Sequence, residues 1–250
     1  MIKSEIKNNT GIIFLARPEK RNALNPELVE SLKNILSDYK INDEIKSIII
    51  TGEGNSFCAG ADLEYLNSLS TNSTIENYND TKSLAELFLM IYGYPKPTIV
   101  AVNGAAIAGG CGLASVCDFI IAHPEKSKFG YSEVKIGFIP AIVSIFLIKK
   151  VGEGLAKQLL LEGEIISGTR AYEIGLVNYL SENVLDDSIS LADRLNKNSV
   201  ESLRITKQMI NNISNLSVQE AVDYCVGLNT ISRATKDFKI RIENFLNKDK

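Results

Sequence analysis

The chain of 250 residues lacks the residue patterns that several classes of binding site require. It has one histidine and four cysteines, and the cysteines do not form the closely spaced pairs of a zinc site, so we expect reduced thiols and no bound metal. The formal net charge is -3, and without an excess of positive charge a nucleic-acid or membrane-surface partner is not expected. No apolar run is long enough to span a membrane and the N-terminal residues do not resemble a secretory signal, so we expect a cytoplasmic protein.

What the sequence does have is an alternation of apolar, strand-like segments with amphipathic helical segments. Hydrophobic residues make up 45% of the chain and charged residues 23%, as in soluble globular domains. Strands are predicted over residues 3–7, 12–16, 46–51, 98–102 and 119–122, and helices over residues 26–39 and 74–92. Asn25 and Pro26 supply the N-cap and the first-turn proline of the first helix. The alternation predicts an α/β protein with mostly parallel strand pairing.

Beyond about residue 151 the pattern becomes mostly helical. Helices are predicted over residues 152–161, 167–175, 185–196, 200–213 and 217–247, with one short strand over residues 176–180. The sequence therefore predicts a strand-rich core followed by a helical C-terminal region.

Two turns rich in glycine and alanine follow two of the predicted strands. The first is Ser56–Leu63 (SFCAGADL), and the second lies within Asn103–Asp118 (NGAAIAGGCGLASVCD). Turns of this kind that lead into a helix present free backbone N–H groups, and two such groups aimed at one point can hold a developing oxyanion. Either turn alone is more simply explained by close packing of small residues. Their recurrence in two successive units favours the functional interpretation, and neither fits the GxGxxG pattern of dinucleotide sites.

Glu133 is the candidate for proton transfer beside such turns. It lies in KFGYSEVKIGFIP, where aromatic and branched neighbours can desolvate its carboxyl and raise the pKa toward a working value. The alternative is a solvated glutamate paired with Lys135. His123, the one histidine, lies in the polar segment HPEK and is expected at the surface, with no Ser–His–Asp set around it.

Together with the N-terminal segment Arg17–Leu24 (RPEKRNAL), the two turns and Glu133 resemble the enoyl-CoA hydratase/isomerase (crotonase) superfamily over nearly the whole chain. The resemblance implies an α/β fold that is a crotonase-like spiral of ββα units over residues 1–190, with a helical trimerisation region over residues 191–250. It implies an acyl-CoA substrate, with no cofactor besides the coenzyme A of that substrate. It also implies a homotrimer, or a homohexamer of paired trimers.

The same resemblance assigns roles to individual residues. The backbone N–H groups of Ala61 and Gly109 would hold the thioester oxygen, which would explain the small residues of the second turn, and Glu133 would transfer the proton. Lys20 and Arg21 would face the phosphates of coenzyme A, for which cationic donors are suited. The other residues assigned to substrate binding are Ala23, Ala59, Asp62, Leu63, Gly110, Gly112 and Ala141.

Three positions depart from the family pattern. Gly112 stands where hydratases of the family carry a second glutamate that helps to hold and activate water. The segment Ile139–Phe146 is bulkier than the usual glycine-rich run, so it either walls a narrow apolar acyl pocket or packs as a helix. Ile240 and Arg241 replace a common Glu-Gly pair near the C-terminus.

The resemblance therefore implies an enzyme that acts on enoyl-CoA thioesters through an oxyanion hole and a single glutamate. Hydration, or its reverse, is the first interpretation because it is the commoner reaction of the superfamily, and it would make the enzyme a lyase. A Δ3,Δ2-enoyl-CoA isomerase, which needs only one carboxylate, is the alternative that Gly112 favours. A non-catalytic acyl-CoA-binding protein and a nucleotide-binding α/β protein of another family are the further alternatives.

Overall fold

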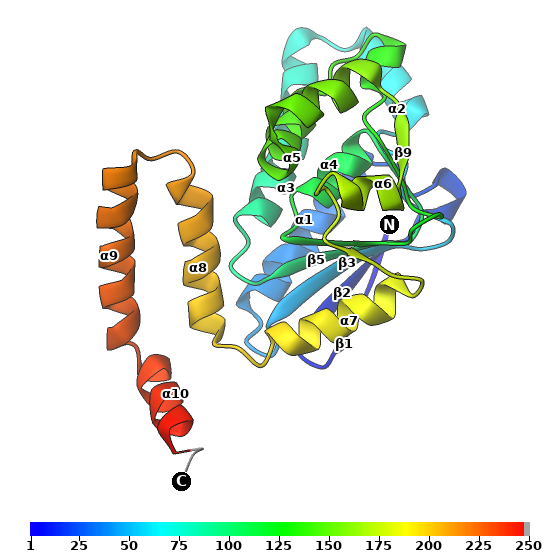
Figure 1. Ribbon diagram of the computed structural model, residues 1–250. Helices are drawn as coiled ribbons and strands as arrows, with labels where there is room; N and C mark the ends of the chain where they lie inside the picture. Colours follow the sequence, from blue (N-terminus) through cyan, green and yellow to red (C-terminus); the bar gives the residue numbers. More distant parts are fainter. Residues whose placement is uncertain (248–250) are drawn as a thin grey trace.

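The computed structural model describes residues 1–247, and its chain repeats a strand–strand–helix order (Figure 1). The first unit holds β1 (Ile2–Lys7), β2 (Thr10–Leu15) and α1 (Pro26–Ile41), and the second holds β3 (Ser47–Gly52), β4 (Ser56–Cys58), α2 (Leu63–Ser68) and α3 (Thr74–Tyr92). The third holds β5 (Thr98–Val102), β6 (Ala105–Ile107) and α4 (Gly109–Ser115), and the fourth holds β7 (Phe119–Ala122), β8 (Lys128–Gly130) and α5 (Ala141–Glu162). The chain then continues through β9 (Ile165–Ser167), α6 (Gly168–Glu173), β10 (Tyr179–Leu180), α7 (Val184–Leu195), α8 (Val200–Ile213), α9 (Val218–Ala234) and α10 (Lys236–Leu246).

The strands form two sheets that the chain visits in turn. A six-stranded sheet has the order β1-β2-β3-β5-β7-β10, and a four-stranded sheet has the order β4-β6-β8-β9. β1 pairs antiparallel with β2, and the other neighbours in the larger sheet pair in parallel. From the second unit on, the first strand of each unit joins the larger sheet and the next strand joins the smaller one. This succession is the spiral of ββα units that the resemblance implied.

Both faces of the larger sheet are covered, which explains the continuous apolar sequence of its parallel strands. Alternate residues of a strand face opposite sides. Ile50 of β3 therefore belongs to the main core with α1 and α3, whereas the adjacent Ile49 belongs to a second core with Leu191 and Ala192 of α7. In Figure 1, α7 lies beneath the larger sheet, away from the other helices of the core.

The strands predicted before residue 123 and the first helices are confirmed with small shifts of their ends. Of the strand predicted over residues 176–180, only Tyr179–Leu180 form β10. The Asn25 side chain caps α1 by accepting a hydrogen bond from the Leu28 N–H at 2.9 Å, and Pro26 occupies the first turn, as the sequence predicted. A second helix, α3, also matches its predicted range.

Two helix predictions are wrong in extent. The helix expected over residues 152–161 begins at Ala141, and Gly152, with a φ of 78°, marks a kink inside α5. The first half of α5 is apolar enough to hide the helical periodicity. The sequence therefore did not decide whether this segment packs as a helix or walls a pocket. The helix expected over residues 217–247 breaks at Thr235, whose side chain accepts a hydrogen bond from the N–H of Phe238 and caps α10.

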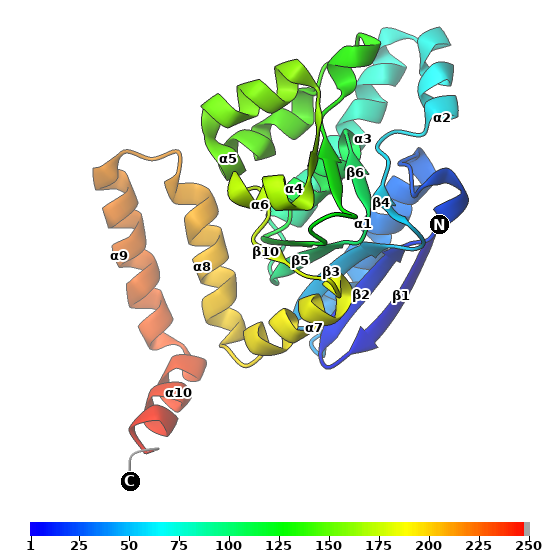
Figure 2. The same cartoon turned by 45° about the vertical axis from the view of Figure 1, so that its right-hand side comes forward.

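The helices α8, α9 and α10 form an arm, residues 200–246, that projects from the core (Figures 1 and 2). None of their side chains is buried within the chain. Polar contacts attach α8 to the core: Lys207 Nζ lies 2.8 Å from the Asp118 carboxylate, and the Asn211 side chain donates to the Tyr92 carbonyl at 3.0 Å. The predicted division at residue 190 falls within α7, which packs on the sheet, and the projecting part starts with α8.

Within residues 1–247, no helix is both long and apolar enough to cross a membrane.

Candidate active site

The two glycine-rich turns lie side by side at the ends of β4 and β6, which are parallel neighbours. A Cβ atom placed on Gly60 would lie 2.7 Å from the Ile107 carbonyl oxygen and 3.5 Å from the Gly109 nitrogen. A Cβ atom on Gly110 would collide with the carbonyl oxygen of Cys58. The turns are therefore built from small residues because the backbone of one touches the backbone of the other.

The location of these turns differs in one respect from the sequence interpretation. They do not directly follow the buried strands β3 and β5 of the larger sheet, because β4 and β6 intervene. The site therefore lies beyond the carboxyl ends of the smaller sheet. Its residues come from segments that follow three neighbouring strands, β4, β6 and β8.

Backbone geometry leaves the N–H groups of Ala61 and Gly109 without an acceptor in the described chain. Leu24 donates to the Gly60 carbonyl at 2.7 Å and accepts from the Asp62 N–H at 2.8 Å. Because N–H groups alternate in direction along an extended segment, the Ala61 N–H points away from Leu24. Gly109 is the first residue of α4, so its N–H has no acceptor within the helix. Two adjoining turns thus offer two free donors.

Ala108 holds the second turn in a strained conformation. Its φ of 49° and ψ of -117° lie in a region that glycine adopts readily and alanine rarely. Its N–H donates to the Gly130 carbonyl at 2.7 Å, and its own carbonyl accepts from the Gly112 N–H at 3.0 Å. These bonds fix the peptide that carries the Gly109 N–H. Ala108 was not identified from the sequence, where its one signal is an alanine directly before two glycines.

Glu133 is buried beside α4. It begins a short 3₁₀ helix (Glu133–Ile136), is 6% exposed, and its Oε2 atom has no hydrogen-bond partner in the described chain. Burial raises the pKa of its carboxyl, and a hydrogen bond from its own backbone opposes part of that shift. Burial likewise raises the pKa of the Cys111 thiol on α4, and the neighbouring Glu133 carboxylate raises it further. The alternative interpretation, an ion pair between Glu133 and Lys135, is wrong, because Lys135 Nζ pairs with the Glu164 carboxylate at 2.7 Å.

Gly112 of α4 is buried and tightly packed. A Cβ atom at this position would collide with Cγ1 of Val143, on α5, and would lie 2.7 Å from Cε2 of Phe88, on α3. The structure therefore leaves no room for a side chain here. Gly112 lies one turn after Gly109 on α4.

A buried ion pair ties the N-terminal segment to the first turn. Arg17 donates to the Asp62 carboxylate at 2.9 Å and to the Ala23 carbonyl at 2.6 Å. The Asp62 carboxylate also accepts the N–H of Glu64 at 3.1 Å and so caps α2. The hydrogen bond from Arg17 is the main reason that the pKa of Asp62 is lowered. The sequence assigned Asp62 to substrate binding, and in the structure its carboxylate bonds to Arg17 and to the backbone of α2.

The predicted phosphate-binding residues lie at the same edge of the site. The Ala59 N–H donates to the Arg21 carbonyl at 3.0 Å, which joins their segment to the first turn. Both Lys20 and Arg21 have exposed side chains. Lys20 Nζ lies 2.8 Å from the Glu64 carboxylate, and Arg21 forms no ion pair among residues 1–247.

The remaining assigned residues differ in exposure. Ala23 is buried, and its carbonyl accepts the hydrogen bond from Arg17. Leu63, at the start of α2, is 73% exposed. Ala141 is exposed where α5 begins, at the end of the loop that follows Glu133.

His123 is buried, so its expected surface position is wrong. Its Nδ1 accepts the N–H groups of Glu125 and Lys126, each at 3.1 Å, and its Nε2 lies 2.8 Å from the Glu182 carboxylate. It borders a cavity of about 330 Å³ that Glu133 does not line. The histidine organises the turn after β7 and lies outside the candidate site.

The sequence profile of the family described as enoyl-CoA hydratase/isomerase matches residues 5–250. The chain belongs to the enoyl-CoA hydratase/isomerase family. A candidate enoyl-CoA hydratase of Thermus thermophilus is 39% identical over 244 residues, which cover 97% of this chain and 96% of that protein. The 2,3-dehydroadipyl-CoA hydratase of Escherichia coli is 33% identical over 240 residues, covering 95% and 92% of the two chains.

Solved structures of the enoyl-CoA hydratase/isomerase family share the whole fold. The crystal structure of an enoyl-CoA hydratase from Polaromonas sp. JS666 matches with a TM-score of 0.94 and 32% sequence identity, covering 99% of this chain and 97% of that one. The resemblance drawn from the sequence is thereby confirmed, as is the α/β class with its helical C-terminal region.

Proposed function

We propose that the protein adds water reversibly across the double bond of 2-enoyl-CoA thioesters. The observation that carries the proposal is the conjunction of two unpartnered N–H groups, on Ala61 and Gly109, with the buried and unpartnered Oε2 of Glu133. The names of the relatives support the reaction type, since those of Escherichia coli and Syntrophomonas wolfei are 2,3-dehydroadipyl-CoA and crotonyl-CoA hydratases.

The reaction follows from what each group can do. The thioester oxygen accepts hydrogen bonds from the Ala61 and Gly109 N–H groups, which stabilise the negative charge that develops there as oxygen adds to the β-carbon. The Glu133 carboxylate removes a proton from the attacking water. The hydroxyl bonds to the β-carbon, and the electron pair of the double bond moves toward the thioester. Glu133 then returns the proton to the α-carbon, so that no metal or further cofactor takes part.

Binding of coenzyme A would use the edge formed by Lys20, Arg21 and Leu63. The exposed cations Lys20 and Arg21 suit the phosphates, and Lys20 would exchange its exposed partner Glu64 for them. The exposed Leu63 offers an apolar contact beside Ala59. We infer a positioning role, rather than a direct ligand contact, for the carboxylate of Asp62.

Isomerisation of 3-enoyl-CoA is a second candidate, because the packing at Gly112 leaves Glu133 as the proposed site's single acid. Incubation with 2-enoyl-CoA and 3-enoyl-CoA separately distinguishes the reactions. We expect 3-hydroxyacyl-CoA from the first substrate, as measured by mass and by loss of the conjugated chromophore. Conversion of the second substrate only to its 2-enoyl isomer would instead make the protein an isomerase. Tight coenzyme A binding without turnover of either would favour the non-catalytic alternative.

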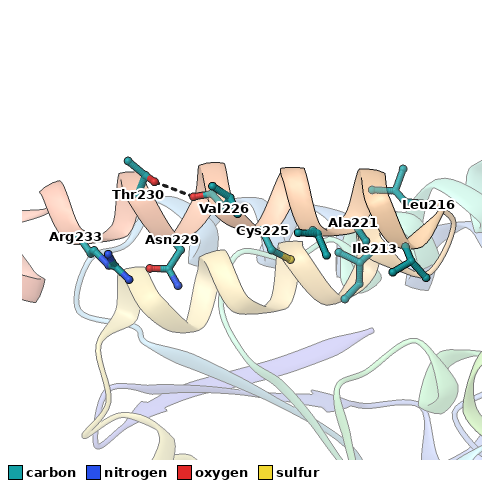
Figure 3. Close-up of a pocket in the computed structure, with 10 residues that line it drawn as sticks. Ile213, Leu216, Ala221, Cys225, Val226, Asn229, Thr230 and Arg233 are labelled. Carbon is teal, nitrogen blue, oxygen red and sulfur yellow. Dashed lines mark hydrogen bonds between the residues drawn. The ribbon is translucent and has the colours of Figure 1, made fainter.

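We also propose that the arm mediates assembly into a homotrimer or a homohexamer. A groove of about 590 Å³ opens along the arm, and Figure 3 shows its lining, with Ile213 at the end of α8 and Ala221, Cys225 and Val226 along α9. Apolar side chains left uncovered in one chain are typical of protein interfaces. The groove lies apart from Glu133, so it is not the substrate site.

Replacement of Val222 and Val226 by aspartate is expected to shift the protein to smaller species. Both side chains are exposed on α9, at 51% and 60%, so the charges are tolerated by the single chain but desolvated in an interface. Light scattering after size-exclusion chromatography measures the mass. Ile41→Asp, at the exposed last residue of α1 in the core, is the matched control and should keep the native mass. A monomeric wild-type protein would contradict the proposal.

A further inference from the structure

The position of Gly112 on α4 defines a place facing the proposed oxyanion hole. Gly109 and Gly112 are three residues apart in one helix, so they lie on the same helical face. Side chains of a helix lean toward its N-terminus. A side chain at position 112 would therefore project back toward the end of α4 that carries the Gly109 N–H. A carboxyl in that place could hold a water molecule beside the acyl carbons.

Carbon atoms occupy that place instead. Cγ1 of Val143 and the Phe88 ring converge on the point where a Cβ of Gly112 would lie. That Cβ would be 2.7 Å from Cε2 and 3.0 Å from Cζ of Phe88. Both side chains are buried, at 5% and 0% exposure. Phe146 packs edge-on against Phe88 with ring centres 6.1 Å apart, and Tyr92 packs on Phe146 at 5.4 Å. The aromatic contacts behind Phe88 restrain it from moving aside.

We infer that Phe88 and Val143 fill the place that a second acid would take beside the site, and that they thereby limit hydration relative to double-bond migration. The inference rests on the proposed function. Hydration needs a water molecule held at the β-carbon, and the wall of carbon atoms packed around Gly112 leaves no room for a second acid that would hold it. Migration needs only Glu133, which removes a proton from the α-carbon of a 3-enoyl thioester and returns it to the γ-carbon. The electron pair of the broken α C–H bond forms the new α,β double bond. The π electron pair of the former β,γ double bond forms the new C–H bond at the γ-carbon.

The test compares four proteins: wild type, Gly112→Glu, Phe88→Ala/Val143→Ala, and the triple variant that combines these three changes. The hydration rate of 2-enoyl-CoA and the isomerisation rate of 3-enoyl-CoA are measured for each, together with the melting temperature. We expect Gly112→Glu alone to melt several degrees lower, because its side chain collides with the wall. We expect the triple variant to raise the ratio of hydration to isomerisation by about tenfold or more, as one positioned acid typically contributes at least that much.

The double variant opens the same space without adding an acid, so it is the matched control and should not reproduce the rise. The inference is wrong if Gly112→Glu alone folds normally and raises the ratio as much as the triple variant, or if a folded triple variant leaves the ratio unchanged. If the triple variant does not fold, Gly112→Asp/Val143→Ala, a smaller perturbation, is judged by the same ratio. Failure of wild type to convert either substrate would remove the proposed function itself, whereas an unchanged ratio in active proteins removes only this inference.

Discussion

Glu133→Gln is expected to lower turnover of enoyl-CoA by about 10²–10⁴-fold, the usual contribution of a positioned acid or base. The amide keeps the size of the side chain but can neither take a proton from water nor deliver one to carbon. Because the proposed coenzyme A contacts of Lys20 and Arg21 do not involve Glu133, binding of a saturated acyl-CoA should persist. Steady-state kinetics and calorimetric titration measure the two properties.

The same substitution should stabilise the protein at neutral pH. Burial raises the pKa of Glu133 in the folded state above its usual value of 4.5, so the native chain binds its proton more firmly than the unfolded chain. The free energy of unfolding therefore falls as pH rises from 4.5 through the raised pKa, and glutamine removes this loss. We expect the melting temperatures of wild type and variant to converge near pH 4 and separate at pH 7, with glutamine higher.

Glu164→Gln provides the control for this pair of effects. Glu164 is exposed and pairs with Lys135, so its replacement should leave turnover unchanged. Wild-type turnover in Glu133→Gln would end the assignment of the proton carrier, whatever the melting temperature.

Ala61→Pro is expected to reduce kcat by about 10²–10³-fold, the effect of removing one oxyanion-hole donor. Proline has no N–H, and no acceptor in the described chain uses the Ala61 N–H, so no internal hydrogen bond is lost. The two hydrogen bonds that Leu24 makes to Gly60 and Asp62 remain available.

Ala61→Gly keeps the N–H and serves as the comparison, with kcat close to that of wild type. Circular dichroism and the melting temperature show whether the proline variant retains the fold. Full activity in a correctly folded Ala61→Pro protein would mean that the thioester oxygen is held elsewhere.

The sequence predicted those parts of the fold that depend on local periodicity. The strands over residues 98–102 and 119–122 and the helix over residues 74–92 matched because their apolar spacing and caps lie within the segment itself. The first half of α5, before the kink at Gly152, was not predicted as a helix, because an apolar run is compatible both with a pocket wall and with a buried helix.

The sequence nominated residues for the candidate site but did not reveal their contacts. Motif positions named Ala61, Gly109 and Glu133, yet the strain at Ala108 is visible only in backbone angles. His123 was misplaced because the polar letters HPEK do not reveal that the imidazole accepts the N–H groups of its own turn. The neighbours of Gly112 come from α3 and α5, distant in sequence, and only the packed chain brings them together.

Under the proposed assembly through the arm, the folding of this protein would depend partly on its concentration. Its helices have 14, 17 and 11 residues, lengths that are marginal in water without packing partners. In that assembly their order would be gained largely on contact with other chains, and by mass action it would weaken on dilution. A freshly made chain could complete its two-sheet core alone while its last helices still fray, which would leave that end the first target of proteases until subunits meet.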